Sequence, residues 1–409
     1  MQRSPRRPWS GRRVVLGVCG GIAAYKVAQV ARDLTLLGAE VDVVPTTSAR
    51  AFVGAVTFEG LTGRPVHTEL VAAGHALDHI RLAREAHAVV VAPATADFLA
   101  RAAAGRCDDL LSAILLATRA PVLVCPAMND RMWSHPQTQA NAAHLRDRLG
   151  YALVGPTSGA LAHGEGEGPG RMVDPQVIVE AVGRALGSRP AWAGRQVVVT
   201  AGPTREAVDA VRFLSNRSSG RMGFALAAAA WRRGAEVRLI AGPTAVAPPS
   251  GPTLVRVETA EEMEAAVRMA LPGAHALIMA AAVADFSPAE VDAGKIKKDA
   301  APDAIALRPA PDILAATRDA RPESLAVMGF ALEAGGDTRA AARGKLAAKG
   351  LDLVVLNDAA TEGAGFEVET NQVCVLDRQG GEEELPLQSK EELAEVLLDR
   401  LEPHMGHGD

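Results

Sequence analysis

Residues 13–44, RVVLGVCGGIAAYKVAQVARDLTLLGAEVDVV, contain the pattern that decides the fold class. The first six residues, RVVLGV, have the apolar character of a buried strand, and a pair of glycines follows them. Apolar residues then recur at helical spacing from Val27 to Leu37, before GAEVDVV supplies a second strand pattern. The stretch therefore predicts a strand–helix–strand unit, the repeating element of parallel sheets that helices cover on both faces.

The second half of the chain repeats this pattern. QVVVTAGPT at 196–204 predicts a strand, FALAAAAWRRG at 224–234 a helix, and the following AEVRLI another strand. Two further segments echo each other, AHAVVVAPATADF at 86–98 and AHALIMAAAVADF at 274–286. We therefore predict an α/β fold with two doubly wound, Rossmann-like parallel sheets, which bind ligands at the carboxyl ends of their strands. The echoes fit either shared fold logic or an internal duplication.

The length of the chain predicts two domains. At 409 residues it is too long for one ordinary core and suits two domains of about 200 residues each. The boundary is expected in GRALGSRPAWAGR, 183–195, where Gly, Pro and small residues separate a helix pattern from a strand pattern. We expect a disordered basic tail at 1–11, a first domain at 12–187, a linker at 188–194 and a second domain at 195–409.

Two capping boxes mark helix starts in the second half. Thr259 precedes Glu262 by three residues, Ser389 precedes Glu392 in the same way, and apolar residues at helical spacing follow each pair. In a capping box, the two side chains bond to free backbone N–H groups at the start of the helix. We therefore expect helices to begin at both positions, the second of them closing the fold.

The composition indicates a globular protein of the cytoplasm. Hydrophobic residues make up 48% and charged residues 22% of the chain, and no apolar run approaches the roughly 18 residues of a membrane helix. The basic start leads directly into a strand pattern, without the apolar core of a signal peptide. With a net charge of −5 and no basic patch interleaved with aromatics, we expect neither nucleic acid nor a membrane as a partner. No disulfide framework or zinc-ligand spacing is formed by the four cysteines, Cys19, Cys107, Cys125 and Cys374.

Small and polar residues follow the predicted strands of the first half. CGGIAAYK at 19–26 places glycines where free backbone N–H groups and a helix dipole can hold a phosphate, although a plain glycine turn is an equal reading. His79 lies seven residues before the strand pattern that begins the segment 86–98, and a lone histidine is usually structural. Met128 and Asn129 follow another strand, where the amide can orient a carboxylate or simply make a turn.

Taken in order, the motifs of residues 12–185 resemble the flavin-containing cysteine decarboxylases. They are GGIAAYK, a threonine before AxxF, HIxLA, APATAD, DDLLS, PAMNxxMW and GxGRM, of which PAMNxxMW is the most specific. The resemblance implies a first domain of that fold type, with His79 as the catalytic base. It implies FMN bound by Gly20, Gly21, Thr46, Ala94 and Thr95, and substrate bound by Met128, Asn129, Arg171 and Met172.

The implied reaction solves a chemical problem, because a carboxylate on an unactivated carbon cannot leave as CO₂. Oxidation of the neighbouring cysteine thiol by the flavin creates an electron sink, CO₂ departs, and the reduced flavin returns its hydride. His79 assists the first proton removal in this scheme.

The second half carries groups that suit phosphate. Asn216, Arg217, Ser218 and Ser219 precede a helix start, where hydroxyls, an amide and free N–H groups fit an anionic phosphate ester, although such residues are also ordinary helix caps. GKIKKD at 294–299 has three lysines in four residues, which suit a polyphosphate or simply a solvated face.

Motifs of residues 195–400 resemble the phosphopantothenate–cysteine ligases. They are TAGPTRExxDxVRxxSNxSSGxMGxAxA, AAVADF, KIKK, PDIL and GFALE, with Lys345 and Lys349 one helical turn apart. The resemblance implies that CTP converts the carboxylate of 4′-phosphopantothenate to an acyl-cytidylate with release of pyrophosphate, and that the amine of L-cysteine then displaces CMP. Joined to the first half, the whole chain resembles the bifunctional decarboxylase/ligase family of bacterial coenzyme A biosynthesis.

The ligase resemblance also implies residue roles. Asn216 stabilises the acyl-cytidylate, and Lys295 meets developing phosphate charge. Asp285 is assigned to Mg²⁺, with a ribose or base contact as the alternative. The implied CTP site comprises Met279, Ala280, Ala281, Asp285, Lys295, Pro311, Asp312, Ile313, Leu314, Phe330, Lys345 and Lys349.

One segment departs from the decarboxylase pattern. SGALAHGEGEGPGRM at 158–172 corresponds to a flap in which the family has a proton-donating cysteine, and His163 stands in its place in a loop one residue longer. Imidazole is a competent acid near neutral pH. We hypothesise that His163 donates the final proton; the alternative is an active ligase whose first domain binds FMN but completes decarboxylation poorly.

The resemblance further implies a large homo-oligomer, up to a dodecamer, in which neighbouring first domains share flavin sites. Two rival classes are a nicotinamide dehydrogenase and an FMN-binding regulatory protein. The sequence does not support a dehydrogenase, because no GxGxxG motif is followed by an acidic residue at the position that would bind the ribose of the cofactor. The regulatory protein draws its support from His163 alone.

Overall fold

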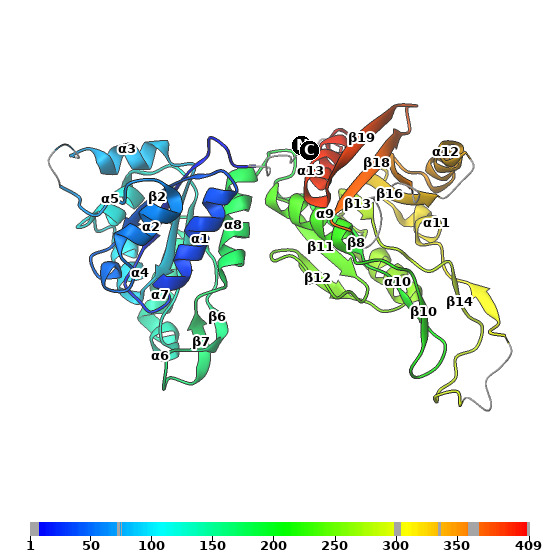
Figure 1. Cartoon of the computed structure of the whole chain (residues 1–409), viewed down its shortest axis with the longest axis horizontal. Coiled ribbons are helices and arrows are strands. Elements are labelled where there is room, and N and C mark those ends of the chain that lie inside the picture. Colours follow the sequence, from blue (N-terminus) through cyan, green and yellow to red (C-terminus); the bar gives the residue numbers. More distant parts are fainter. Residues whose placement is uncertain are drawn as a thin grey trace. The chain divides into compact units, whose positions relative to one another are not determined.

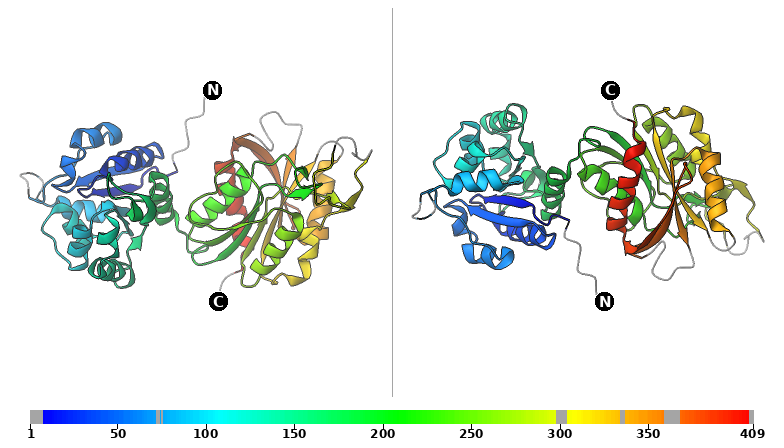
Figure 2. Two further views of the ribbon diagram at one scale, coloured as in Figure 1. Left: turned by 90° about the horizontal axis from the view of Figure 1, so that it is seen from below. Right: turned by 90° about the horizontal axis from the view of Figure 1, so that it is seen from above.

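The computed structural model describes residues 8–71, 74, 76–297, 304–333, 337–358 and 368–406, and it divides into two compact units between Gly187 and Ser188 (Figures 1 and 2). Residues 1–7 of the expected tail lie outside the described residues. Trp9, just after them, donates its backbone N–H to the Leu37 carbonyl at 3.1 Å and packs against the core of the first unit.

A five-stranded parallel sheet in the order β2-β1-β3-β4-β5 forms the centre of the first unit. Its strands are β1 Arg13–Val18, β2 Glu40–Pro45, β3 Ala88–Ala94, β4 Val122–Pro126 and β5 Ala152–Leu153. The antiparallel hairpin of β6 Thr157–Ala160 and β7 Glu167–Arg171 stands apart from this sheet. The helices are α1 Ala24–Leu36, η1 Ala49–Ala51, α2 Ala55–Thr62, α3 Asp78–Glu85, α4 Ala96–Ala103, α5 Leu110–Ala117, α6 Asp130–Ser134, α7 Pro136–Asp147 and α8 Pro175–Gly187.

Helices cover both faces of this sheet, as the doubly wound prediction requires. Val14 and Leu16 of β1 pack with buried residues of α1, α2 and α8 in one cluster. Val15 packs on the opposite side with buried residues of α3, α4, α5 and α7. Successive side chains of a strand point to opposite faces, so one apolar strand serves two cores.

The second unit contains an eight-stranded sheet in the order β12-β11-β8-β13-β16-β17-β18-β19. Its strands are β8 Gln196–Ala201, β11 Glu236–Ala241, β12 Thr253–Arg256, β13 Ala276–Met279, β16 Ala326–Glu333, β17 Leu353–Asp358, β18 Thr370–Asp377 and β19 Glu382–Ser389. Two small ribbons pair β9 Arg205–Ala207 with β10 Phe213–Ser215, and β14 Phe286–Pro288 with β15 Leu307–Pro309. The helices are α9 Arg221–Arg232, α10 Ala260–Ala270, α11 Ile313–Ala316, η3 Arg318–Ala320, α12 Thr338–Lys349, α13 Lys390–Leu401 and η4 Glu402–His404.

Six strands of this sheet, from β12 to β17, are parallel, which confirms the fold class. The last two pairings, β17 with β18 and β18 with β19, are antiparallel. A tight turn between Asp377 and Gly381 joins β18 to β19, and a connection this short forces antiparallel neighbours. This antiparallel edge differs from the predicted all-parallel sheet.

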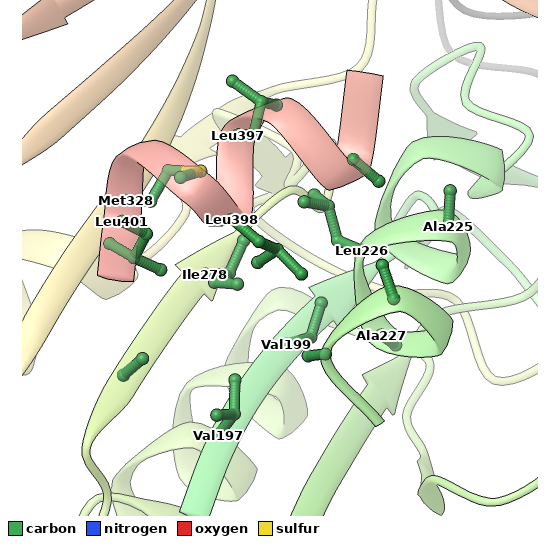
Figure 3. Close-up of a cluster of buried hydrophobic side chains, with 14 of the residues drawn as sticks. Val197, Val199, Ala225, Leu226, Ala227, Ile278, Met328, Leu397, Leu398 and Leu401 are labelled. Carbon is green, nitrogen blue, oxygen red and sulfur yellow. The ribbon is translucent and has the colours of Figure 1, made fainter. Parts of the chain in front are cut away.

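The faces of the second sheet are covered by α9 and α13 on one side and by α10 and α12 on the other. Figure 2 shows α13 in red and α12 in orange on opposite sides of the sheet. Figure 3 shows Leu398 of α13 and Leu226 of α9 close to Val199 and Ile278 of the strands beneath. Gly223 brings α9 close to the sheet, because a Cβ there would lie 2.5 Å from the Cβ of Ala201 on β8.

Both predicted capping positions begin helices. Ser389 and Glu392 form the full capping box at the start of α13. Thr259 caps α10 by accepting the backbone N–H of Glu262 at 3.1 Å, but the Glu262 carboxylate instead accepts the backbone N–H of Glu258 at 2.7 Å. None of the helices among the described residues has the length and apolar character needed to cross a membrane.

Candidate functional site

The first unit has a cavity of about 410 Å³ at the carboxyl ends of β1, β3 and β4. The sheet order changes direction between β1 and β3, and α/β sheets bind ligands at such a switch point. The cavity volume lies within the range of small-molecule sites. Among the predicted site residues, its lining includes Gly20, Gly21, Thr95, Met128, Asn129, Arg171 and Met172.

Two glycines form the turn between β1 and α1 for different reasons. A Cβ at Gly20 would lie 2.4 Å from the Ser48 hydroxyl oxygen, so a side chain there would clash with the loop after β2. A Cβ at Gly21 would approach only Thr95, at 3.9 Å, and would take space from the cavity. Gly21 therefore leaves the start of α1 open to the cavity, as a phosphate site requires.

Thr95 and Asn129 each cap a helix at the cavity. The Thr95 hydroxyl oxygen accepts the backbone N–H of Phe98 at 3.2 Å, at the start of α4. The Asn129 side-chain oxygen accepts the backbone N–H of Arg131 at 2.9 Å, at the start of α6. Asn129 therefore makes the turn and also lines the cavity, so its predicted roles in a turn and in ligand binding are compatible.

The hairpin β6–β7 packs directly on the loop that carries Asn129. The backbone N–H of Met128 donates to the Gly170 carbonyl at 2.9 Å. A Cβ at Gly170, whose φ is +128°, would lie 2.3 Å from the Met128 carbonyl oxygen, so only glycine permits this approach. Ala162 and Glu165 at the hairpin tip line the cavity, whereas His163 between them is exposed and is not part of the lining.

Three other predicted residues, Thr46, Ala94 and His79, are not among the described residues that line this cavity. Thr46 is half-buried and donates its backbone N–H to the Val18 carbonyl at 2.8 Å, and its hydroxyl lies 3.2 Å from that of Ser48. Ala94 is fully buried, and its carbonyl accepts the backbone N–H of Ala127 at 3.0 Å. His79 is the third residue.

His79 is the second residue of α3, and its Nδ1 is buried without a hydrogen-bond partner among the described residues. The preceding Asp78 carboxylate lies 3.3 Å from Nδ1 of His67, and His67 Nε2 lies 3.9 Å from Asp42. Asp42 is buried in β2 and also pairs with Arg64 at 2.8 Å. Charged contacts thus anchor the start of α3. His79 is not among the described residues that line the cavity with Asn129.

The second unit has a cavity of about 410 Å³ at the carboxyl edge of its sheet. It is lined from segments far apart in the sequence, namely the start of α9, the segment after β13, the start of α11, the strands β16 and β17, and α12. Its lining contains the predicted residues Asn216, Met279, Ala280, Ala281, Asp285, Pro311, Asp312, Ile313, Leu314, Phe330, Lys345 and Lys349.

Asn216 holds the segment after β13 in place. Its side-chain nitrogen donates to the carbonyls of Ala282 at 3.2 Å and Val283 at 2.9 Å. The buried Thr200 and Thr204 accept backbone N–H groups of the same segment through their hydroxyls, from Ala281 at 3.2 Å and Ala284 at 3.0 Å. The segment is therefore fixed in an extended form that faces the cavity.

Charge within this cavity is partly paired. Lys349 at the end of α12 lies 3.0 Å from the Asp312 carboxylate. Burial raises the pKa of Asp312, but the hydrogen bonds from Lys349 and the Ala315 backbone outweigh it, so the pKa of this carboxyl is below its usual value. Asp312 therefore remains ionised and orients Lys349, whereas the Asp285 carboxyl is exposed at the cavity.

Lys295 is the exception in the predicted nucleotide set. It is exposed and absent from the cavity lining, and Lys298 of the same motif lies outside the described residues. Asp209 holds the adjacent backbone, because its carboxylate accepts the Ile296 N–H at 3.2 Å and bonds to the Arg212 guanidinium. The Arg212 guanidinium in turn donates to the Ile296 carbonyl at 2.9 Å. This clasp fixes the loop beside β9 and outside the cavity.

Two protein-family models match the chain. One, described as DNA/pantothenate metabolism flavoprotein C-terminal domain, matches residues 192–404, and the other, described as Flavoprotein, matches residues 2–187. The coenzyme A biosynthesis bifunctional protein CoaBC of Mycolicibacterium smegmatis is 47% identical over 404 residues, which cover 95% of this chain and 97% of that protein. The CoaBC of Escherichia coli K12 is 44% identical over 400 residues, which cover 96% and 97%.

The chain belongs to this family of bifunctional coenzyme A biosynthesis proteins. It is an enzyme with a flavoprotein decarboxylase half and a phosphopantothenate–cysteine ligase half, which excludes the dehydrogenase and the purely regulatory protein. A solved structure of the C-terminal domain of a CoaBC protein also aligns, at 36% identity and a TM-score of 0.45. The alignment covers 53% of this chain and 97% of the chain in that structure.

Several cavity residues of the bifunctional enzyme were not predicted from its sequence. In the second cavity they are Arg221, Asn357, Asn371 and Lys390. Lys390 directly follows the capping residue Ser389, so the predicted start of this helix was the sequence feature that could have pointed to Lys390. No sequence pattern indicated that β18 and β19 would bring this helix start to the cavity of the second unit, because their antiparallel pairing was not predicted.

Proposed function

We propose that the first unit performs FMN-dependent decarboxylation of phosphopantothenoylcysteine to 4′-phosphopantetheine. The open turn at Gly21 and the start of α1 fit the FMN phosphate, because a side chain at Gly21 would fill the space. Thr95 and Gly20 complete that wall. The bound flavin supplies the two-electron oxidation that makes loss of CO₂ feasible.

The substrate carboxylate then lies against Met128 and Asn129, with Arg171 and Met172 on the hairpin side. Arg171 is half-exposed and lies 3.2 Å from Asp174, so it can turn toward an anionic substrate at small cost. His79 removes the first proton in this proposal. Because His79 lies away from Asn129 in one chain, we propose that it serves the cavity of a neighbouring subunit, with first domains sharing flavin sites in a homo-oligomer.

We propose His163 as the final proton donor. Ala162 and Glu165, its neighbours at the hairpin tip, line the cavity, so a small movement of the tip places the imidazole there. Mass analysis of the product tests this role. An aminoethanethiol product supports donation by His163, and a product two hydrogens lighter that persists in the wild type contradicts it. His163→Cys should then restore the reduced product.

We propose that the second unit uses CTP to join 4′-phosphopantothenate to L-cysteine. A carboxylate oxygen attacks the α-phosphorus, pyrophosphate leaves, and the cysteine amine then attacks the acyl carbon and releases CMP. The convergence of Asn216, Asp285 and the α12 lysines Lys345 and Lys349, from three separate segments, on one cavity carries this proposal. Asn216 stabilises the acyl-cytidylate, and the two lysines bind the nucleotide.

Lys295 reaches this site only if its loop moves. We propose that the loop approaches when substrates bind and that Lys295 then meets the charge that develops on phosphate. The Asp209 carboxylate holds the backbone at Ile296, so this movement requires the contact between Asp209 and Ile296 to break.

We propose that Mg²⁺ binds at Asp285 together with phosphate oxygens. Mg²⁺ characteristically takes one or two carboxylates plus substrate phosphates, and Asp285 offers one carboxylate at the cavity. The group of three metal-ligand side chains found among the described residues is Cys374, Glu382 and Glu384, which does not line this cavity. Glu382 and Glu384 there pair with Arg339.

The test of the proposed function is direct. Purified enzyme should show a flavin absorption spectrum, and CTP with Mg²⁺, 4′-phosphopantothenate and L-cysteine should yield CMP. A colourless protein that binds NADH would contradict the flavin assignment, and equal ligation with ATP alone would contradict the nucleotide assignment. A cytoplasmic location is proposed from the sequence.

A further inference from the structure

One lysine of the ligase cavity lies at the end of a helix, where the backbone is least constrained. Lys349 is the final residue of α12, and Gly350 ends the helix with a φ of +60°. Terminal turns of helices fray easily, because their last carbonyls have no partner within the helix. Lys349 can therefore keep a fixed place in the cavity only if groups outside α12 bind this turn.

Two arginines close to η3 supply such groups. Arg318 donates from its guanidinium to the Ala348 carbonyl at 3.0 Å, and Arg321 donates to the Lys349 carbonyl at 2.9 Å. Positive groups are favourable at a helix C-terminus, because the helix dipole places partial negative charge there. Both arginines therefore stabilise the last turn of α12.

Arg321 differs from Arg318 because it also binds the end of α11. A second nitrogen of its guanidinium donates to the Leu314 carbonyl and, at 3.3 Å, to the Thr317 hydroxyl. Thr317 is fully buried, and its hydroxyl donates to the Ile313 carbonyl at 2.6 Å. Arg318 is exposed, and its guanidinium makes no bond to α11 among the described residues. Arg321 thus joins α11 to the last turn of α12.

The same two helices are also joined inside the cavity. Figure 1 shows α11 beside α12. Asp312 caps the start of α11, and its carboxylate lies 3.0 Å from Nζ of Lys349. Arg321 is not among the described residues that line the cavity, so it binds the two helices from outside it. An ion pair in the cavity and an arginine outside it therefore hold α11 and α12 together.

The burial of Arg321 shows that this contact has a cost. Burial and the charge of Arg318 lower the pKa of Arg321, so its surroundings disfavour the charged guanidinium. Its Nε is buried without a hydrogen-bond partner among the described residues. Because an arginine stays protonated in proteins, the acceptors on α11 and α12 must offset this cost.

We propose that Arg321 is a positioning residue of the ligase reaction, which holds Lys349 in place for CTP by joining α11 to the last turn of α12. The inference rests on the proposed function of the second unit, in which Lys349 binds the nucleotide. Without Arg321, the last turn of α12 can unwind, and the Lys349 ammonium loses its fixed position beside Asp312. Arg321 thus acts on CTP through Lys349 and does not touch the nucleotide itself.

A double-mutant cycle on CTP binding, measured by calorimetry with Mg²⁺ on the full chain, tests this role. Lys349→Met should weaken CTP binding by about tenfold or more, because one charge-assisted contact is lost. Arg321→Met should weaken it by about fivefold, and the double variant should bind CTP within about twofold of Lys349→Met alone. If Arg321 had a structural role only, the two losses would multiply to about fiftyfold.

Arg318→Met is the matched control, because it removes an arginine–carbonyl bond from the same helix turn and leaves the bond to α11 in place. It should lower the midpoint of thermal unfolding but change CTP binding by less than about twofold. Losses that multiply in the double variant would overturn the proposal, and so would unchanged CTP binding in Arg321→Met or equal weakening in Arg318→Met.

If Arg321→Met does not fold, Arg321→Lys takes its place in the cycle, and the same outcomes decide. A lysine keeps the charge but cannot bond to both helices through two separate nitrogens. A Lys349→Met enzyme that binds CTP as the wild type does would instead overturn the role of Lys349 in the proposed function.

Discussion

The echoed segments 86–98 and 274–286 begin alike and end differently. In both, the histidine at the second position accepts the first strand's backbone N–H through Nδ1 at 3.1 Å, His87 from Arg13 and His275 from Gln196. In the first unit the final Ala-Asp-Phe lies in helix α4, which Thr95 caps. In the second unit the same three residues lead into strand β14.

The partners of the backbone explain this difference. After β3, the Thr95 side chain satisfies a free N–H of the first turn, so a helix can begin. After β13, backbone N–H groups are already bound by Thr200, Thr204 and the Gly202 carbonyl, so no helix can form. The segment after β3 therefore places a helix start at the first cavity. The segment after β13 places an extended backbone, held by Asn216, at the second cavity.

The largest change in activity is expected from His79→Asn, which should affect the reaction of the first unit alone. It should lower CO₂ release from supplied phosphopantothenoylcysteine by about a hundredfold or more, because the proposed base is lost. Release of CMP by the ligase should stay within about twofold, because His79 lies in the other unit. His144→Asn, an exposed histidine on α7, is the control and should leave both rates unchanged. Loss of both activities in His79→Asn would contradict separate sites.

The reverse effect is expected from Asn216→Asp. The carboxylate cannot donate to the carbonyls of Ala282 and Val283 and would face their oxygens, so the extended segment loses its support. CMP release should fall by about a hundredfold, while decarboxylation of supplied phosphopantothenoylcysteine continues. A ligation rate close to that of the wild type would remove Asn216 from the proposed mechanism.

Thr95→Ala and Thr259→Ala form a matched pair that sharpens the contrast between the segments. Each removes a helix N-cap and should lower the free energy of unfolding of its own unit by about 1 kcal/mol. Only Thr95 lines the first cavity, so only Thr95→Ala should also weaken retention of the flavin. Denaturant unfolding and flavin titration measure the two effects, and equal flavin retention in both variants would exclude Thr95 from the flavin site.

The smallest effect concerns the shared histidine position. Burial and the charge of Arg195 lower the pKa of His275, so the folded state resists its protonation. The stabilisation is complete above the unfolded value of about 6.5 and declines as the pH falls below that value toward the lowered folded pKa. His275→Asn keeps an acceptor for the Gln196 N–H but does not titrate. In this variant the free energy of unfolding should therefore lose part of its dependence on pH below about 6.5, and an unchanged dependence would contradict this role.

Much of the fold could be predicted because apolar runs and helical spacing report burial directly. The strand–helix–strand unit at 13–44 appears as β1, α1 and β2, and the Ser389 capping box begins α13. The antiparallel edge of β18 and β19 could not be predicted, because strand direction depends on pairing partners rather than on apolar pattern.

The candidate sites were predicted where a residue follows a central strand, as Thr95 and Asn129 do. Contacts that depend on distant segments were missed, because the pattern around a residue does not report its spatial neighbours. Lys390 reaches the ligase cavity through two antiparallel strands, and Lys295 is held outside it by Asp209. The position of His79 depends on a neighbouring subunit in our proposal.

Simultaneous measurement of CMP and CO₂ tests most directly whether two separate sites act in sequence. Wild-type enzyme given 4′-phosphopantothenate, L-cysteine, CTP and Mg²⁺ should form CMP and CO₂ in equal amounts. Asn216→Asp should form neither from this mixture but should release CO₂ from supplied phosphopantothenoylcysteine, whereas His79→Asn should form CMP without CO₂. CO₂ release from 4′-phosphopantothenate without CMP, or an Asn216→Asp enzyme unable to decarboxylate the supplied intermediate, would contradict the two-site sequence.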